Sequence, residues 1–293
     1  MKVLLLHNPE AGDVGLDERD LTALLRKSGC DVTYVPTNSP AMGRALSEPV
    51  DLVVVAGGDG TVAKVLSQAT PQSAPLTILP LGTANNLARA VGIRGDIPEL
   101  IAGFHDGRMT PFDFGMTVGP WGRQRFFESA GFGAIARALA PVNESKVPSA
   151  RKIPQGRRAL QAVLKDLPPT RLQITLDDRE LTEDLLLLEV MNIASIGPKL
   201  CLAPTADPGD GYLQVACLSP RRREAALEWL SDPESGGPAP VDLYTARRVA
   251  VQWRDTPSHL DDYFHDAPGQ TCSMKAWLEP AAINLLVPGT RAG

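Results

Sequence analysis

Residues that form disulfides or metal clusters are scarce in this chain. Its 293 residues include four cysteines and four histidines, and no two cysteines form a Cys-x-x-Cys pair. Scattered thiols of this kind are typical of reduced, intracellular proteins. The sequence therefore argues against a disulfide framework and against a clustered zinc site, and it favours a cytoplasmic location.

Long apolar runs and an excess of positive charge are also absent. No apolar stretch is long enough to span a bilayer, and the short run at residues 3–6 predicts a first core strand rather than a signal peptide. The net charge of −5 argues against bulk nucleic-acid binding. If the substrate is a lipid, the protein must therefore meet the membrane surface from one side.

What the chain does have is a regular alternation of apolar strands and amphipathic helices in its first half. Strands are predicted at residues 2–7, 31–35, 52–56 and 76–79. Such an alternation predicts a doubly wound, parallel α/β sheet. Ligands of these sheets bind beyond the carboxyl ends of the strands, which is where Asn8, Thr37 and Gly57 fall.

The turn after the third strand has the layout of a phosphate site. Its sequence, Gly-Gly-Asp-Gly-Thr at residues 57–61, lies between a buried strand and a helix-like apolar spacing that begins at Val62. Glycines let the backbone approach an anion, and the first helical N–H groups then point at it. The turn is not a Walker A loop, because no Gly-Lys-Ser/Thr follows. An ordinary turn explains the glycines about as well, but Asp59 among them favours a metal ion or a proton transfer.

A second turn of this type follows the fourth strand. We predict a helix over residues 84–91 with Thr83 as its N-cap, although a plain cap explains Thr83 as well as a ligand does. Thr37 or Ser39 is the predicted cap of a short helix that ends at Leu46. Two glycine turns in consecutive β-α units predict a shared phosphate site.

Strands dominate the chain from about residue 119. They are predicted at residues 171–176, 185–193, 212–217, 248–253, 271–278 and 283–287. We also predict a helix from Ala130 to Leu139, an exposed loop over residues 142–155 and a helix over residues 156–167. The resulting division is an α/β domain (1–118), a mainly β domain (119–280) and a tail (281–293) that can pack back on the first domain.

Five motifs resemble those of the diacylglycerol kinase catalytic-domain family, in its bacterial lipid-kinase branch, which is related to the sphingosine kinases. In chain order they are Asn8-Pro9-x-Ala11-Gly12, Gly57-Gly58-Asp59-Gly60-Thr61, Leu81 through Arg89, Phe127 through Gly133, and a late run with Asn192, Leu202-Ala203-Pro204-x-Ala206 and Asp210-Gly211-x-Leu213. The Gly-Gly-Asp-Gly motif alone is shared with NAD kinases. The ordered set is specific, and it covers nearly the whole chain.

The resemblance implies an N-terminal α/β domain of the NAD kinase and diacylglycerol kinase type, a C-terminal β sandwich, and ATP between them. It implies nucleotide contacts at Asn8, Thr37, Gly57, Gly58, Asp59, Gly60, Thr61, Val62, Ala63, Gly82, Thr83 and Asn85. It also implies a Mg²⁺ site on the side chain of Asp210 and on backbone carbonyls around Asp207 and Tyr212. The local sequence there equally suits a polar turn.

The chain departs from the family at the residue taken as the catalytic base. The family carries Asp-Gly-Glu on a late strand, and its Glu accepts the proton of the lipid hydroxyl. This chain has no Asp-Gly-Glu, and residues 260–263 and 265–268 compete for its place. The first stretch follows the preceding strand more naturally, which leaves Tyr263 at the position of the Glu. The base is therefore Asp59, Asp261, Asp262 or Asp266, or it is absent; Asp59 and Asp261 are the predicted catalytic residues.

The resemblance implies ATP-dependent phosphorylation of a diacylglycerol-like lipid by a cytoplasmic enzyme that touches the membrane peripherally. A kinase of the NAD kinase type and an inactive nucleotide- or lipid-binding protein remain alternatives, and a homodimer is open. Five basic residues could contact anionic headgroups, although a solvated basic surface explains them slightly better: Lys146, Arg151, Lys152, Arg157 and Arg158.

Overall fold

The computed structural model describes residues 1–11, 15–70, 73–143, 149–234, 237–267 and 269–289. The chain divides into two compact units, one formed by residues 1–112 with the chain's end from residue 281, the other by residues 113–280. Two strands, β5 (Arg108–Gly119) and β18 (Cys272–Val287), begin in one unit and end in the other. Gly12, Lys146 and Pro268, which belong to predicted sequence features, lie outside the described residues.

The first unit is built on a parallel sheet with the strand order β2-β1-β3-β4-β18. Its strands are β1 (Lys2–His7), β2 (Asp31–Pro36), β3 (Leu52–Gly57), β4 (Leu76–Pro80) and the last residues of β18. All six residues of β3 are buried, as its unbroken apolar sequence predicts for a strand covered on both faces. The predicted parallel α/β fold is confirmed.

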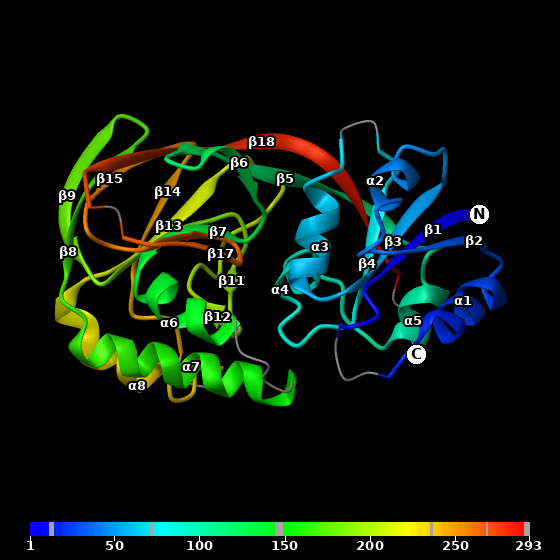
Figure 1. Ribbon diagram of the computed structural model, residues 1–293, viewed down its shortest axis with the longest axis horizontal. Coiled ribbons are helices and arrows are strands. Elements are labelled where there is room, and N and C mark those ends of the chain that lie inside the picture. The colour runs from blue at the N-terminus through cyan, green and yellow to red at the C-terminus, as the bar shows by residue number, and fades with distance from the viewer. Residues whose placement is uncertain (12–14, 71–72, 144–148, 235–236, 268, 290–293) are drawn as a thin grey trace. The chain divides into compact units, whose positions relative to one another are not determined.

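Five described helices accompany this sheet (Figure 1): α1 (Glu18–Lys27), α2 (Met42–Ala45), α3 (Asp59–Leu66), α4 (Asn86–Ala90) and α5 (Ile97–Ala102). The prediction for α2 was wrong in its cap, because the helix begins at Met42 and no side chain caps it. The Ser39 hydroxyl instead accepts from the Ala41 amide in the preceding turn, and Thr37 is buried.

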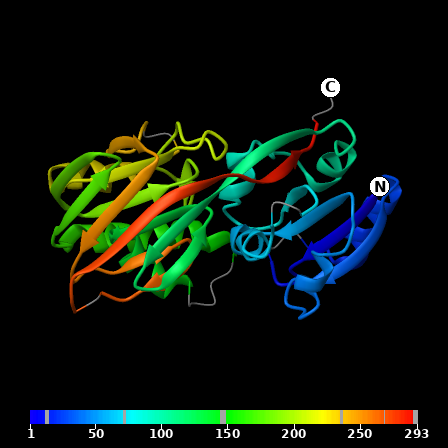
Figure 2. The ribbon, with the colours of Figure 1, turned by 90° about the horizontal axis from the view of Figure 1, so that it is seen from above.

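The second unit is an antiparallel β sandwich (Figures 1 and 2). One sheet has the order β14-β13-β10-β7-β16-β17. Its strands are β7 (Ser129–Gly133), β10 (Leu187–Met191), β13 (Leu213–Leu218), β14 (Asp242–Ala246), β16 (Ser258–Leu260) and β17 (Tyr263–His265). The other sheet contains β5, β6 (Gly122–Phe126), β8 (Thr170–Leu176), β9 (Arg179–Leu185), β15 (Arg248–Trp253) and the start of β18, the long red strand in Figure 2.

The core of the sandwich comes from the facing sides of its two sheets, for example Val190 and Val215 on one sheet and Ile174 and Val251 on the other. A second apolar cluster lies on the opposite face of the β10 sheet. Three helices cover that face (Figure 1): α6 (Ala134–Asn143), α7 (Ser149–Asp166) and α8 (Arg223–Trp229). A 3-10 helix, η1 (Pro220–Arg222), precedes α8, and two short strands, β11 (Ser195–Ile196) and β12 (Leu200–Cys201), pair with each other.

Three predictions for this unit were wrong. Residues 130–133 belong to strand β7, and the helix begins only at Ala134. Part of the predicted loop over 142–155 is helical, because α6 reaches Asn143 and α7 begins at Ser149. The predicted strands at 271–278 and 283–287 are one continuous strand, β18.

Candidate active site

The two glycine turns of the first unit touch through their backbones. Gly58 is the N-cap of α3, and Gly82 follows β4. A Cβ atom placed on Gly82 would lie 2.4 Å from Gly58 Cα, and one on Gly58 would lie 3.0 Å from Gly82 Cα. The Leu81 N–H also donates to the Gly57 carbonyl at 3.0 Å. No side chain fits between these turns, so they form one continuous surface of backbone.

Asp59 joins the two helices that leave these turns. It is the first residue of α3, three positions before Val62, where the helical apolar spacing of the sequence begins. Its Oδ1 accepts from the Leu87 N–H at 2.9 Å, and Leu87 lies in the first turn of α4. A carboxylate in the first turn of a helix is favoured by the helix dipole. Here the Asp59 carboxylate lies at the N-terminus of α3 and also accepts a hydrogen bond from the first turn of α4.

Asn85 shapes the second turn, and the prediction that Thr83 is the N-cap of the following helix was wrong. The helix α4 begins at Asn86, and its N-cap is Asn85, with no capping side-chain hydrogen bond. Asn85 has a φ of 52°, which Asn adopts more easily than most residues. Its Oδ1 accepts from Gly82 N at 3.0 Å, and its Nδ2 donates to Gly82 O at 2.7 Å. Thr83 therefore lies inside a turn that Asn85 closes.

Asn8 and Thr37 lie at the ends of the neighbouring strands. The Asn8 Nδ2 donates to Thr61 Oγ1 at 3.0 Å, which ties the loop after β1 to the first turn of α3. The Thr37 N–H donates to the His7 carbonyl at 2.8 Å. The structure thus brings Asn8 and residues 57–63 together with Gly82 and Asn85. Val62 is buried, so its side chain faces the core.

The three residues of the predicted magnesium site lie on one loop of the second unit. Asp207 Oδ1 accepts from Gly209 N at 3.0 Å, and Asp210 Oδ1 accepts from Tyr212 N at 2.8 Å. The loop is anchored on Asp113, which sequence reasoning missed. This buried carboxylate accepts from Gly211 N at 2.9 Å, and the Asp113 N–H donates to the Pro208 carbonyl at 2.6 Å.

The donors of this loop suit magnesium in kind. Carboxylate and carbonyl oxygens are hard ligands, and Mg²⁺ usually binds only one or two carboxylates while it keeps several waters. Among the described residues, no group of three or more His, Cys, Asp or Glu side chains could hold a metal ion. The side chains of this loop alone therefore do not form a metal site.

Asp261 clamps the start of β7. It lies between β16 and β17, and its carboxylate accepts from the N–H groups of Phe127 at 2.9 Å, Glu128 at 2.8 Å and Ser129 at 3.1 Å. Burial raises the pKa of the Asp261 carboxyl to about 6, although these three donors act in the opposite direction. The three other residues of this stretch that bear on the base, Asp262, Tyr263 and Asp266, are exposed.

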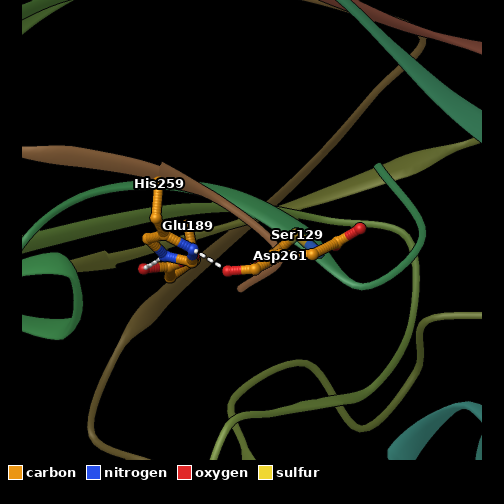
Figure 3. A network of polar contacts seen from close by, with 4 residues as sticks. All are labelled: Ser129, Glu189, His259 and Asp261. Atoms are coloured by element: carbon orange, nitrogen blue, oxygen red, sulfur yellow. Dashed lines mark hydrogen bonds and ion pairs between the residues drawn. The ribbon is translucent and has the colours of Figure 1, made fainter. Parts of the chain in front are cut away.

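Sequence reasoning also missed a buried acid–base pair beside Asp261 (Figure 3). His259 Nε2 lies 3.0 and 3.1 Å from the two carboxylate oxygens of Glu189, and His259 Nδ1 lies 2.9 Å from the Asp261 carbonyl oxygen. Both side chains are almost fully buried. One signal was available, since Glu189 is the only charged residue in the apolar stretch from residue 185 to residue 191.

The basic residues of α7 differ in their surroundings. Arg157 donates to Glu234 at 3.0 Å and to the Pro198 carbonyl at 3.1 Å, so its side chain holds α7 to neighbouring loops. Arg151 and Lys152 are exposed. In the part of the chain that the structure describes, no helix has the length and apolar character to cross a membrane.

Comparison with known families accounts for nearly the whole chain. The family model described as "Diacylglycerol kinase catalytic domain" matches residues 2–117. The model described as "YegS C-terminal NAD kinase beta sandwich-like domain" matches residues 128–287. The chain belongs to the diacylglycerol kinase family of lipid kinases.

Curated relatives agree with this membership. A protein of Bacillus subtilis (strain 168) named "Diacylglycerol kinase" is 31% identical over 73% of this chain and 72% of its own length. A protein of Mycobacterium tuberculosis (strain ATCC 25618 / H37Rv) with the same name is 27% identical over 98% and 95%. A Pseudomonas savastanoi pv. phaseolicola (strain 1448A / Race 6) protein named "Probable lipid kinase YegS-like" is 30% identical over 98% and 93%.

Solved structures show that the diacylglycerol kinase fold extends to NAD kinases. A diacylglycerol kinase structure from Bacillus anthracis str. Sterne has a TM-score of 0.71 at 19% identity and covers 98% of this chain and 97% of its own. An NAD kinase from Archaeoglobus fulgidus in complex with ATP has a TM-score of 0.56 at 12% identity and covers 99% and 94%. At these identities the likeness concerns the fold alone.

Proposed function

We propose that this protein is an ATP-dependent lipid kinase, which transfers the γ-phosphate of ATP to a hydroxyl group of diacylglycerol or a related lipid. One observation carries the proposal: the glycine turns after β3 and β4 touch each other in a chain that belongs to a lipid kinase family. Because glycines face each other where the two turns meet, an anion as large as a triphosphate can approach the N–H groups at the start of α3.

The proposed nucleotide site uses the first unit. The N–H groups at the start of α3 would bind phosphate oxygens, helped by the helix dipole. Gly58 and Gly82 would let the phosphates approach the backbone, and Asn85 would hold the second turn in shape. Asn8, Thr37 and Thr83 would complete the contacts around the nucleotide.

Phosphate transfer also needs charge neutralisation and a base. Asp210 and the backbone carbonyls around Asp207 and Tyr212 would hold Mg²⁺, which supplies positive charge against the phosphate oxygens when it is bound. Asp59 or Asp261 would accept the proton of the lipid hydroxyl, a contribution of about a hundredfold or more to the rate. Asp262 and Asp266 remain alternatives for this role.

The lipid tails are proposed to enter the second unit beneath its helices. A narrow apolar cavity of about 20 Å³ lies there, lined among others by Leu160 and Leu164 of α7, Trp229 of α8 and Leu187 of β10. Such a volume holds about one water molecule, so an acyl chain requires α7 and α8 to move away from the sheet. Exposed Arg151 and Lys152 would attract anionic headgroups, which makes a cytoplasmic, peripherally membrane-bound enzyme the proposed setting.

A transfer assay tests this proposal. The purified full chain is incubated with Mg²⁺, γ-labelled ATP and mixed micelles of dioleoylglycerol, and the extracted products are separated by thin-layer chromatography. We expect label in the phosphorylated lipid, and we expect Asp59→Asn to remove it. The matched control is Asp166→Asn, because Asp166 is an exposed carboxylate at the end of α7.

Two outcomes would overturn the proposal. Label in NADP, when NAD replaces the lipid, would support a soluble-substrate kinase of the NAD kinase type. Binding of ATP with magnesium, but no transfer to any lipid of a broad panel, would support an inactive homologue. If the transfer occurs and none of Asp59→Asn, Asp261→Asn, Asp262→Asn and Asp266→Asn reduces it, the assignment of the base to these carboxylates fails.

The absent Glu favours the inactive homologue as the second candidate. Tyr263 is 69% exposed, so its side chain can be exchanged with little effect on the core. We expect Tyr263→Glu to raise the transfer rate by about tenfold or more if residues 261–263 replace the Asp-Gly-Glu of the family. Tyr263→Gln is the matched control without the carboxylate, and an equal rate for the two variants would reject this alignment.

A further inference from the structure

The Glu189–His259 pair is assembled by three neighbouring strands. Gly131 of β7 lies opposite Glu189 of β10 on one side and opposite His259 of β16 on the other. A Cβ atom on Gly131 would lie 2.1 Å from Glu189 Oε1. The carboxylate of Glu189 therefore crosses over a glycine to reach the imidazole, and only a residue without a side chain allows this contact.

The hydrogen bonds of His259 determine where its protons lie. Its Nδ1 faces the carbonyl oxygen of Asp261, which can only accept, so Nδ1 carries a hydrogen. Its Nε2 faces the two oxygens of Glu189. Burial lowers the pKa of His259, but Glu189 and the Asp261 carbonyl more than offset this, so the pKa is raised. Both ring nitrogens thus face acceptors, an arrangement that suits an imidazolium, which donates on both sides.

His259 completes the set of contacts that hold the backbone of Asp261. Asp261 has a φ of 48°, in the left-handed region, which Asp and Asn adopt more easily than most other residues with a side chain. Its N–H donates to the Ser129 carbonyl at 2.9 Å, and its carboxylate accepts from residues 127–129. The third polar group of Asp261, its carbonyl, is the one that His259 binds. All three polar groups of Asp261 are therefore held by hydrogen bonds, which fix its backbone conformation.

We propose that Glu189 and His259 are positioning residues, which fix the backbone of Asp261 and thereby place the turn at residues 261–263 for phosphate transfer. The inference rests on the proposed function, because it gives the pair a role in the same reaction. Glu189 orients and charges the imidazole, and the imidazole Nδ1–H holds the Asp261 carbonyl. Neither side chain touches the substrate in this role.

Two matched double variants separate positioning from mere packing. Both replace Glu189 with Gln, which removes the buried charge. One adds His259→Asn, whose amide nitrogen can take the place of Nδ1, and the other adds His259→Gln, whose amide nitrogen can take the place of Nε2. Neither variant carries a charge at the two positions; they differ by one methylene and in which hydrogen bond they keep.

Steady-state kinetics give the first readout. We expect Glu189→Gln/His259→Asn to keep kcat within about threefold of the wild type. Glu189→Gln/His259→Gln should lower kcat by roughly tenfold to a hundredfold, because small misplacements of reacting groups have effects of this size. KM for ATP and the melting temperature should agree between the two variants. Equal kcat values in the two variants would overturn the proposal.

Hydrogen exchange gives a readout that needs no activity. The amides of Phe127, Glu128 and Ser129 donate to the Asp261 carboxylate, so their exchange reports whether Asp261 is in place. We expect slow exchange in the wild type and in Glu189→Gln/His259→Asn, and faster exchange in Glu189→Gln/His259→Gln. If the wild type transfers no phosphate, the proposed function fails while exchange still decides whether the pair positions Asp261. Equal exchange in both variants rejects that role.

Failure of the second variant to fold would not end the test. His259→Gln with Glu189 retained keeps an amide nitrogen at the place of Nε2 as a partner for the carboxylate, but it removes the hydrogen bond to the Asp261 carbonyl. We then expect the same fall in kcat with an unchanged KM for ATP. A wild-type kcat in His259→Gln would overturn the proposal.

Discussion

At the scale of single residues, the buried and half-buried carboxylates of this chain organise the backbone. Asp59, Asp113 and Asp261 each accept N–H groups from segments far away in the sequence. An ionised acceptor makes a stronger hydrogen bond than a neutral one, so these side chains fix the turns that they reach. The sequence predicted Asp59 and Asp261 from motifs, but no motif marks the partners that a buried carboxylate will find. Asp113 and Glu189 were missed for that reason.

The pKa values of Asp261 and His259 predict how stability depends on pH. The pKa of Asp261 is about 6 in the folded chain, above its unfolded value, so the folded state binds this proton more tightly. Stability from Asp261 is therefore present at about pH 4 and is lost as the pH rises to about 6, by roughly 3 kcal/mol in total. The pKa of His259 is raised too, so its contribution is complete below about pH 6.5 and is lost as the pH rises through the folded value.

Urea unfolding between about pH 4 and pH 8 measures this dependence. We expect the wild type to become more stable relative to Asp261→Asn as the pH falls from about 6 towards about 4. The variant Glu189→Gln/His259→Asn should remove the fall in stability above about pH 6.5. Parallel pH curves for the wild type and both variants would contradict these assignments.

At the scale of elements, the sequence predicted the parallel half of the fold better than the sandwich. Local sequence is enough to predict several elements of the first unit. Unbroken apolar runs predict strands β1 and β3, and apolar residues at a 3.6-residue spacing predict helix α1. The identity of β7 depends on distant partners. Its Gly131 makes room for Glu189, and its Gly133 packs against the Leu186 carbonyl, so glycines that were predicted to lie at the start of a helix belong to a strand.

The candidate site shows the same division. The two glycine turns were predicted from their own residues, whereas the start of α4 was not. Whether Thr83 caps that helix depends on Asn85, whose side chain folds back onto Gly82 and closes the turn first. Thr83, Asn85 and Asn86 offer several local hydrogen-bonding patterns of similar energy, and the sequence does not choose between them.

The contact between the glycine turns can be tested with one methyl group. Gly82→Ala puts a Cβ 2.4 Å from Gly58 Cα and 2.8 Å from Asn85 Oδ1, so the turns must separate. We expect at least about tenfold weaker binding of ATP with magnesium, because N–H groups aimed at one anion would move apart. Calorimetry measures the affinity. The matched control is Gly269→Ala, where a Cβ meets nothing within 4 Å and the affinity should not change.

At the scale of the whole molecule, the end of the chain completes the unit formed by its beginning. Leu285 of β18 pairs with Leu76 of β4 in the parallel sheet, and the Gly289 N–H donates to the Gly103 carbonyl at 2.9 Å. The family model of the sandwich extends to residue 287, although the chain from residue 281 onwards belongs to the compact first unit. A family model covers a continuous stretch of sequence, whereas a compact unit is defined by contacts in space. The two boundaries differ here for that reason.

This arrangement predicts that a substitution near the C-terminus weakens the nucleotide site. Leu285 is 1% exposed, and Leu285→Ala should lower the unfolding free energy by about 2–5 kcal/mol, because it leaves a cavity in the parallel-sheet core. Hydrogen exchange should rise in β3 and β4 more than in β10. The affinity for ATP should fall as this unit loses stability, since the glycine turns begin at the ends of β3 and β4.

Asn284→Ala is the matched control on the same strand, where the side chain is exposed. If Leu285→Ala raised exchange in β10 as much as in β3, the end of the chain would not belong to the core of the first unit.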